Sequence, residues 1–345
     1  MSIDSLVHVN IYVNNICEKG CKLCYYPKGS VEISKDRAFD IAKWIIEDQI
    51  VPENYMIHFL GGESLNSFDR ILDIVDYAIA HKPNSSSWIF EKPASIFTNG
   101  DLLTEITLKE VKKRNIAIIL NPTYDTMDDI RKKVELVKSV CGGCSFSIVM
   151  DDMNMSRIED LTKLALDYDC NIRTNRLYDG GRREGYVEAY KQSCLKMLNI
   201  LLESEKVMRP TLLIENTAPI YTYVARYGKG LISYFVAIDP DGNIRNCSAD
   251  IDTVVGNIYT HSLTDLKSVC SHDNPGCYYW HTNNIPECQS CEWEWICHGG
   301  CPYTRKLAYG SYDIKSPFCS AFKELFPLLM KMVERWVDKT GEKEK

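Results

Sequence analysis

The sequence predicts an α/β fold with a parallel sheet, followed by a small cysteine-rich domain that ends in a helix. Two observations support this prediction. In residues 1–206, short apolar runs alternate with segments of helical periodicity, as is typical of repeated strand–helix units. From Tyr234 onward, cysteines and turn residues replace that alternation. We therefore expect residues 1–206 to form the α/β domain and residues 236–345 to form the cysteine-rich domain. Residues 207–235 are expected to bridge these two domains.

Six apolar runs are expected to form the strands, and each is followed by a helix candidate. The runs are residues 7–13, 55–60, 94–98, 116–120, 144–150 and 171–177. Ser34 is a suitable N-cap, and apolar residues recur at helical spacing after Ser34 and after Ser67. Ser156 with Glu159 has the spacing of a capping box ahead of a later helix. Six units are fewer than the eight of a closed TIM barrel.

The charge and the cysteine content narrow the class of protein. The 345 residues carry a formal net charge of −7, which argues against nucleic acid as a partner, because binding to phosphates needs an excess of Lys and Arg. The N-terminus lacks the pattern of a secretory signal, and no apolar run approaches the roughly 20 residues that span a bilayer. We therefore expect a cytoplasmic protein without a membrane partner. In that reducing compartment, cysteines at regular spacing are expected to bind metal.

Three cysteines, Cys17, Cys21 and Cys24, follow the first predicted strand with spacers of three and two residues. Cysteine thiolates are the usual ligands of iron–sulfur clusters, and a [4Fe–4S] cluster has four irons to satisfy. Three ligands leave one iron open to a small molecule, which favours chemistry over electron storage. A zinc site that lacks its histidine, or chance in a chain with 15 cysteines, are the alternatives.

A second short motif, Gly61-Gly62-Glu63, follows the second predicted strand. Two glycines let the backbone approach a ligand closely, and a carboxylate complements a cationic amine. Alone, this tripeptide is an ordinary turn. Together with the three cysteines and the aromatic Tyr25 behind them, it resembles the signature of the radical S-adenosylmethionine (radical SAM) enzymes.

This resemblance implies a partial (β/α)6 barrel and a [4Fe–4S] cluster whose open iron binds S-adenosylmethionine. It also implies that the glutamate of the Gly-Gly-Glu motif receives the amino group of that cofactor. In parallel α/β folds, sites gather at the carboxyl ends of the strands, where several further candidates lie. The expected cofactor-binding residues are Tyr25, Gly61, Gly62, Glu63, Thr98, Asn99, Asn121, Ser147 and Arg176. A simple turn at 98–100, and hydrogen bonds within the barrel for the last three residues, are the alternatives.

The last third of the chain carries a longer cysteine pattern, Cys288-x2-Cys291-x5-Cys297-x3-Cys301, with Cys319 further on. It follows a predicted hairpin turn at 239–243 and the cysteine at position 247. A zinc ribbon is the alternative from spacing alone. The whole pattern resembles the SPASM domain, which holds auxiliary iron–sulfur clusters in many radical SAM enzymes.

The SPASM resemblance implies two sets of ligands. Cys288, Cys291, Cys297 and Cys319 would hold one auxiliary [4Fe–4S] cluster, and Cys247 and Cys301 would belong to another. The family's further cysteine falls here on His261, so the second ligand set stays open. It is completed by His261, by Cys270 or Cys277, or not by the protein at all.

Four other cysteines are expected to be reduced or buried small residues. They are Cys141, Cys144, Cys170 and Cys194.

The resemblance implies that a 5'-deoxyadenosyl radical takes hydrogen from a peptide substrate and that the auxiliary clusters accept the remaining electron. We expect an oxidoreductase that cross-links or oxidises a ribosomally made peptide, with a flavodoxin or ferredoxin as reductant. The chain begins with the predicted barrel, so leader recognition would need a separate leader-binding protein or the barrel itself. Alternatives are formylglycine maturation of a sulfatase, dehydrogenation of a small molecule, and a non-enzymatic iron–sulfur carrier. No catalytic acid or base is assigned.

Overall fold

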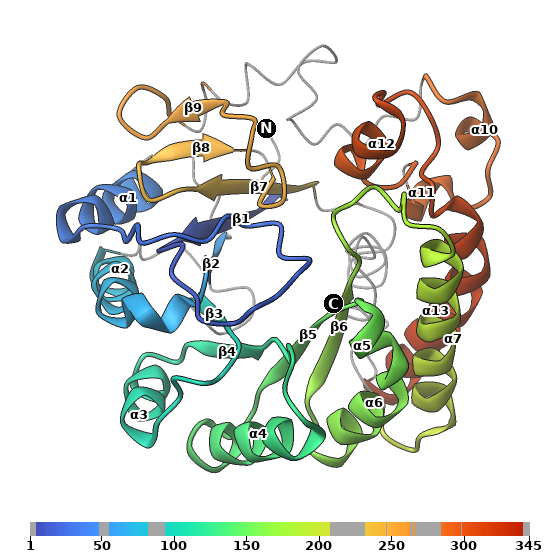
Figure 1. Cartoon of the computed structure of the whole chain (residues 1–345), viewed down its shortest axis with the longest axis horizontal. Coiled ribbons are helices and arrows are strands. Elements are labelled where there is room, and N and C mark those ends of the chain that lie inside the picture. The colour runs from blue at the N-terminus through green and yellow to red at the C-terminus, as the bar shows by residue number, and fades with distance from the viewer. Residues whose placement is uncertain are drawn as a thin grey trace. The chain divides into compact units, whose positions relative to one another are not determined.

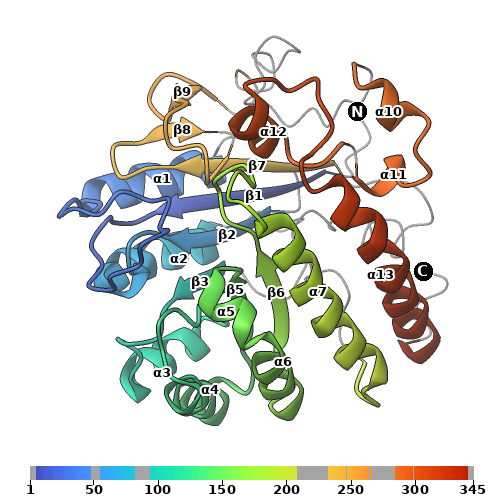
Figure 2. The same cartoon turned by 45° about the vertical axis from the view of Figure 1, so that its right-hand side comes forward.

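The computed structural model describes eight stretches of the chain, namely residues 5–47, 55–81, 94–207, 232–245, 247–262, 265, 284–297 and 299–340. The chain divides into two compact units. Unit 1 comprises Met1–Asn121, Lys132–Cys144 and Ile232–Tyr279, and unit 2 comprises Pro122–Arg131, Ser145–Leu231 and Trp280–Lys345. Figures 1 and 2 give the elements of each unit their labels.

Unit 1 is built on a sheet with the strand order β4-β3-β2-β1-β7-β8-β9. Its strands are β1 (Ser5–Tyr12), β2 (Tyr55–Leu60), β3 (Ala94–Thr98), β4 (Ala117–Leu120), β7 (Ile232–Ile238), β8 (Asn243–Arg245) and β9 (Gly256–Asn257). The strands from β1 to β4 pair in parallel, and β7 also joins β1 in parallel. β8 and β9 then pair antiparallel, as the predicted hairpin turn at 239–243 requires.

The helices of unit 1 follow the strands in the predicted order. They are α1 (Lys35–Glu47), the short 3₁₀ helix η1 (Ser64–Ser67), α2 (Phe68–His81) and α3 (Glu105–Lys113). α4 (Met127–Cys141) is divided between the units at Lys132. α1 and α2 pack side by side next to β1 and β2 (Figure 1). Alternate residues of β1, such as Val9 and Ile11, are at most 2% exposed and form the core of this layer.

Unit 2 holds the remaining strands and most of the C-terminal helices. Its elements are β5 (Ser145–Val149), α5 (Asp152–Ser156), α6 (Ile158–Asp167), β6 (Asn171–Asn175), α7 (Tyr186–Glu203), α10 (Pro286–Gln289), α11 (Glu294–Cys297), α12 (Pro302–Tyr309) and α13 (Cys319–Thr340). β5 and β6 pair in parallel. α13 runs alongside α7 in both views (Figures 1 and 2). Arg335 of α13 fixes this pairing, because its Nη1 donates to the carbonyl of Leu202 at 2.7 Å near the end of α7.

The observed α/β fold confirms the predicted fold class, and all six predicted strands are present within three residues of their expected bounds. The prediction of a capping box at Ser156 is wrong. Asp151 caps an earlier short helix, α5, by accepting from the backbone N of Asn154, so Ser156 lies inside that helix. α6 begins after Arg157 without a side-chain cap.

The predicted domain boundaries stay a prediction, because residues 208–231 lie outside the described residues. The last residues of the expected bridging segment, 232–235, belong to β7.

None of the helices in the described part of the chain combines the length and the apolar character that a membrane crossing needs.

The substitution Ile11→Ala tests the central place of β1, which lies between β2 and β7. Ile11 is fully buried, so the lost methyl groups leave a cavity, and we expect the free energy of unfolding to fall by about 2–5 kcal/mol. Chemical denaturation of the metal-free protein measures this. The matched control, Ile106→Ala, removes a side chain that is 76% exposed and should cost no more than about 0.5 kcal/mol. Equal losses in the two variants would contradict the assignment of β1 to the core.

Candidate functional site

The three N-terminal cysteines lie on a loop that leaves the end of β1. Cys17 and Cys21 are half-buried and Cys24 is exposed. The pKa of the Cys21 thiol is raised, first by burial and then by the neighbouring Cys24, and Cys17 acts in the same direction. Cys21 therefore lies within electrostatic reach of both Cys24 and Cys17.

Gly61 and Gly62 bring the end of β2 against the start of this cysteine loop. The backbone N of Gly62 donates to the carbonyl of Asn14 at 3.0 Å, and that of Glu63 donates to the carbonyl of Ile16 at 2.7 Å. A Cβ at Gly62 would lie 2.4 Å from the Ile16 carbonyl oxygen. The glycine is needed here because two backbone segments touch, and the segment that it touches leads directly into Cys17.

The Glu63 carboxylate joins the same point to the end of β3. It is 4% exposed, and its Oε1 accepts from Thr98 Oγ1 at 2.7 Å and from the backbone N of Leu65 at 3.0 Å. Its Oε2 accepts from the backbone N of Asn99 at 2.8 Å, which leaves this oxygen capacity for a second donor. Burial raises the pKa of Glu63, and the three hydrogen bonds oppose that shift. The group is thus a buried, fixed acceptor that suits a cationic amine.

Two elements of this site were missed from sequence. Asn14, which is fully buried, donates from Nδ2 to the Glu63 carbonyl at 2.9 Å and so adds a third link between the two loops. Asp101 accepts from Lys133 at 2.5 Å and pairs with Lys19 of the cysteine loop at 2.9 Å. Burial opposes these bonds, but they outweigh it and lower the pKa of Asp101. An Asn that interrupts the end of an apolar run was the available signal for the first. The ion pairs of Asp101 join residues far apart in sequence, so no local pattern signals them.

Tyr25 lies between the cysteine loop and Cys247. Its hydroxyl is 3.0 Å from that of Tyr12, and the Tyr12 hydroxyl donates to the carbonyl of Ser248. The pKa of Tyr25 is raised, first by burial and then, against the Tyr12 hydrogen bond, by Cys24 and Cys247. Two predicted metal ligands of unit 1, Cys24 and Cys247, therefore lie within electrostatic reach of one tyrosine.

His261 lies in the turn that follows β9. Its Nδ1 is 2.8 Å from Thr260 Oγ1, and its carbonyl accepts from the indole N–H of Trp44. Its role as a ligand stays a prediction. Cys270 and Cys277 lie outside the described residues.

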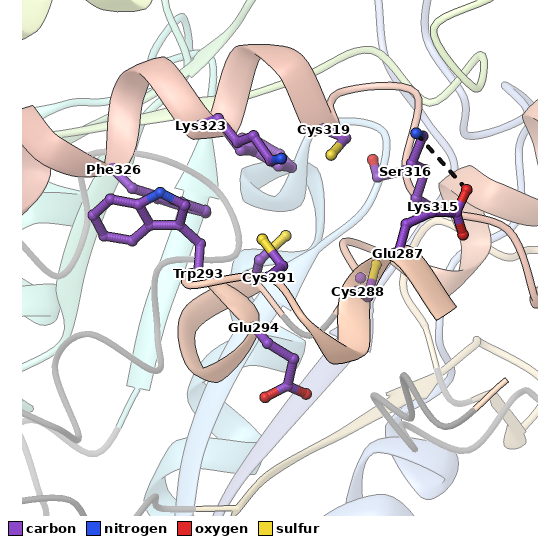
Figure 3. A pocket seen from close by; sticks show the side chains of 13 residues that line it. Glu287, Cys288, Cys291, Trp293, Glu294, Lys315, Ser316, Cys319, Lys323 and Phe326 are labelled. Carbon is purple, nitrogen blue, oxygen red and sulfur yellow. Dashed lines mark ion pairs between the residues drawn. The ribbon is translucent and has the colours of Figure 1, made fainter. Parts of the chain in front are cut away.

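Four cysteines of the C-terminal pattern converge on one pocket in unit 2. Figure 3 shows Cys288, Cys291 and Cys319 around it, and Cys297 completes the lining. The pKa of Cys297 is raised to about 12, first by burial and then by Cys319 and Cys288. At neutral pH the Cys297 thiol therefore stays protonated unless a bound metal compensates the charge of its thiolate. Four cysteines around one cavity are the donor set of a [4Fe–4S] cluster, so the residues fit this group.

Two glycines with positive φ follow the cysteines of this pocket in sequence, and Gly299 lines it. Gly299 and Gly300 have φ values of 76° and 77°, and a Cβ at Gly300 would lie 2.4 Å from the Cβ of Ser316. Ser316 in turn donates its backbone N to the Gly299 carbonyl at 3.1 Å. This contact brings the segment that leads into Cys319 back to Cys297.

The remaining candidate ligands are placed as follows. Cys301 is buried at the start of α12, also in unit 2. The Asn121 backbone N donates to the carbonyl of Thr98 in unit 1. Ser147 accepts from Asn175 at 2.6 Å, and Arg176 donates from Nε to Thr304 at 3.0 Å, both within unit 2.

Roles of these residues in cofactor binding stay predictions. Among the residues described, no three His, Cys, Asp or Glu side chains form a group that could hold a single metal ion. Cys144, Cys170 and Cys194 are buried free thiols and Cys141 is half-buried.

The sequence and the fold were compared with those of known proteins. No family model matches the sequence. A protein of Methanocaldococcus jannaschii, described as uncharacterized, is 26% identical over 182 residues, and the match spans 48% of this chain and 60% of that protein.

Solved structures match over nearly the whole chain. The structure of anSMEcpe, an anaerobic sulfatase-maturing enzyme, with AdoMet and the Cp18Cys peptide has a TM-score of 0.77 at 16% identity, covering 97% of this chain and 99% of that one. The structure of SuiB of Streptococcus suis with its precursor peptide SuiA has a TM-score of 0.62 at 15% identity. The match covers 92% of this chain and 76% of that one. The chain has the fold of these radical SAM enzymes.

Gly62→Ala tests the contact that holds the cysteine loop. The added Cβ overlaps the Ile16 carbonyl oxygen, so the loop must move, and we expect the protein to lose the iron of its first centre after anaerobic reconstitution. Iron analysis and EPR spectroscopy measure this. Gly20→Ala is the matched control, because Gly20 lies in the same loop and a Cβ there meets no atom within 4 Å. Full iron in both variants would show that the loop does not depend on this contact.

Proposed function

We propose that this chain is a radical SAM enzyme that acts on a peptide. One observation carries the proposal: in unit 1, the three-cysteine loop and the buried Glu63 carboxylate are tied together by direct backbone hydrogen bonds. A site with three thiols and an adjacent carboxylate acceptor suits an iron–sulfur cluster with one open iron and a ligand that carries an amine. The fold shared with anSMEcpe and SuiB supports this proposal.

The residues of the first site have distinct roles in this proposal. Cys17, Cys21 and Cys24 hold the [4Fe–4S] cluster, and Glu63 accepts the amino group of S-adenosylmethionine. When both are bound, they supply a 5'-deoxyadenosyl radical that takes hydrogen from the substrate. Thr98 and the Asn99 backbone hold the Glu63 carboxylate in one orientation, so that the amine is bound without reorganisation.

The auxiliary pocket of unit 2 has a second role. Its four cysteines would hold a [4Fe–4S] cluster, which would supply an acceptor for the electron left on the substrate. Cys247 and Cys301 are proposed as ligands of a further centre. The reaction as a whole is then a two-electron oxidation, and a flavodoxin or ferredoxin supplies the electron that starts it.

The proposed substrate is a ribosomally made peptide, which the enzyme cross-links or oxidises in its backbone. Support comes from the two neighbours, whose structures contain the peptides Cp18Cys and SuiA. A separate leader-binding protein is a further proposed partner.

Formylglycine maturation of a sulfatase is the second candidate. The structural match covers 99% of the anSMEcpe chain but only 76% of the SuiB chain. This difference favours formylglycine maturation as the second candidate. The products separate the two candidates, because only a formylglycine peptide carries an aldehyde that reacts with a hydrazide.

The central experiment is cleavage of S-adenosylmethionine. The anaerobically reconstituted protein, reduced with dithionite, should release 5'-deoxyadenosine, and Cys24→Ala should lose this activity while keeping the auxiliary clusters. Liquid chromatography measures the product. Cys141→Ala is the control, since Cys141 lies at the far end of α4 and should leave the rate unchanged. Release no faster than from the Cys24 variant would support the electron-carrier alternative.

Thr98→Val tests the electrostatics of Glu63. Burial raises the pKa of this carboxyl group and the hydrogen bond from Thr98 opposes that, so the substitution should raise the pKa further. Because the ionised form binds the amine, binding of S-adenosylmethionine is lost as the pH falls through that pKa. The loss should therefore begin at a higher pH in the variant.

Calorimetric titrations across a pH series measure this change. Thr162→Val is the control, because Thr162 is equally buried but donates only to the Ile158 carbonyl inside α6. Identical pH profiles for Thr98→Val and the parent would contradict the proposed role of Glu63.

A further inference from the structure

A lysine of α4 is held by the turn that follows β3. Lys133 Nζ donates to the Asn99 carbonyl at 2.9 Å and to the Asp101 carboxylate at 2.5 Å. Lys133 lies in the part of α4 that belongs to unit 1, and its side chain is 16% exposed. Because an ammonium has three N–H donors, it can hold two acceptors of one turn at the same time. The contact therefore fixes this turn to a helix of the same unit.

The backbone of the turn leaves room for this lysine. Gly100 has a φ of 85°, which residues with a side chain rarely adopt, and a Cβ there would lie 2.9 Å from Lys133 Cδ. The backbone N of Asp101 donates to Asn99 Oδ1 at 2.8 Å and closes the turn. Asp101 also pairs with Lys19 of the cysteine loop at 2.9 Å. The turn thus accepts Lys133 at two oxygens and at a position that only glycine leaves open.

Asn99 links this lysine to the Glu63 carboxylate. Its backbone N donates to Glu63 Oε2 at 2.8 Å, while its carbonyl accepts from Lys133. A residue that is held at both its N–H and its C=O loses most of its backbone freedom, and the helix contact supplies one of these two anchors. The direction of the Asn99 N–H, and with it one of the three donors of Glu63, therefore depends on Lys133.

The charge of Lys133 acts on Glu63 in the same sense as the hydrogen bond. Burial is the main cause that raises the pKa of Glu63, and the charge of Asp101 adds to it, whereas the Asn99 N–H opposes both. Lys133 compensates the charge of Asp101 and also holds Asn99. Removal of Lys133 therefore acts twice against the ionised form of the Glu63 carboxylate.

We propose that Lys133 is a positioning residue for the binding of S-adenosylmethionine. It acts through Asn99, whose N–H it holds against the Glu63 carboxylate, and through Asp101, whose charge it compensates. This inference rests on the proposed function. The carboxylate then meets the amino group of the ligand ionised and in a fixed direction, so that binding needs little reorganisation. Lys133 needs no contact with the ligand or the cluster to have this effect.

The test is calorimetric titration of S-adenosylmethionine into the anaerobically reconstituted Lys133→Met variant. Methionine has a similar length but neither the charge nor the N–H donors. We expect binding to be about tenfold weaker at neutral pH, as the loss of about one hydrogen bond predicts. As the pH falls, the remaining binding should disappear at a higher pH than in the parent. Lys109→Met is the control, because it breaks an exposed ion pair with Glu105 on α3 and should leave the titration unchanged.

The pH series separates positioning of Glu63 from a general loss of stability. A general loss weakens binding to the same extent at every pH, whereas a shift in the ionisation of Glu63 moves the pH at which binding is lost. Parental affinity in Lys133→Met at full iron content, or a loss that is uniform across the pH series, would overturn the inference and leave the proposed function intact. A parent protein that binds its iron but not S-adenosylmethionine would contradict the proposed function, and the inference with it.

Hydrogen–deuterium exchange covers the case in which Lys133→Met retains no iron. In the metal-free full chain, the segment 94–104 should exchange faster in the variant than in the parent, because the turn has lost its anchor on α4. The strand β1 should keep its parental rate. Equal rates for the segment 94–104 in the two proteins, or faster exchange of β1 as well, would overturn the inference.

Discussion

The first site depends on one contact between two backbone segments, residues 14–16 and residues 61–63. Side chains would keep these segments apart, and only glycine at position 62 leaves the Ile16 carbonyl room to accept a hydrogen bond from Glu63. The contact fixes both the departure of the cysteine loop from β1 and the orientation of the carboxylate that follows β2. The spacing between thiols and carboxylate is therefore a property of the backbone, which binding of a ligand need not create.

The pocket of unit 2 uses the same physical device. Gly299 and Gly300 adopt a left-handed conformation and pack against Ser316, so that cysteines far apart in sequence meet at one cavity. In both units, a glycine allows a second chain segment to approach closely next to a cysteine. Metal centres need several ligands at fixed distances, and close backbone packing meets that requirement better than long side chains, which would lose conformational entropy on binding.

Each unit contains a buried charged side chain. Glu63 and Arg305 are each more than nine-tenths buried, and such groups are costly unless they have partners. Glu63 has three donors and room for a fourth, which suits a cation. Arg305 has two N–H groups without acceptors among the described residues, which suits an anion. The fold thus holds a buried negative group where the proposed ligand carries an amine.

The sequence by itself determined the strands, the order of strand and helix, and the cysteine sets, because these follow from local periodicity and from spacing along the chain. The bounds of β2 and β3 agree with the predicted runs, since apolar residues flanked by turn residues permit few other structures. The capping box at Ser156 failed, because Asp151 competes for the same segment and starts a helix one turn earlier. Only the tertiary structure decided that β7 joins β1, that Asn14 and Asp101 support the cysteine loop, and that Arg305 is buried. These contacts join residues that are distant in sequence, and no local pattern encodes the partner of a buried charge.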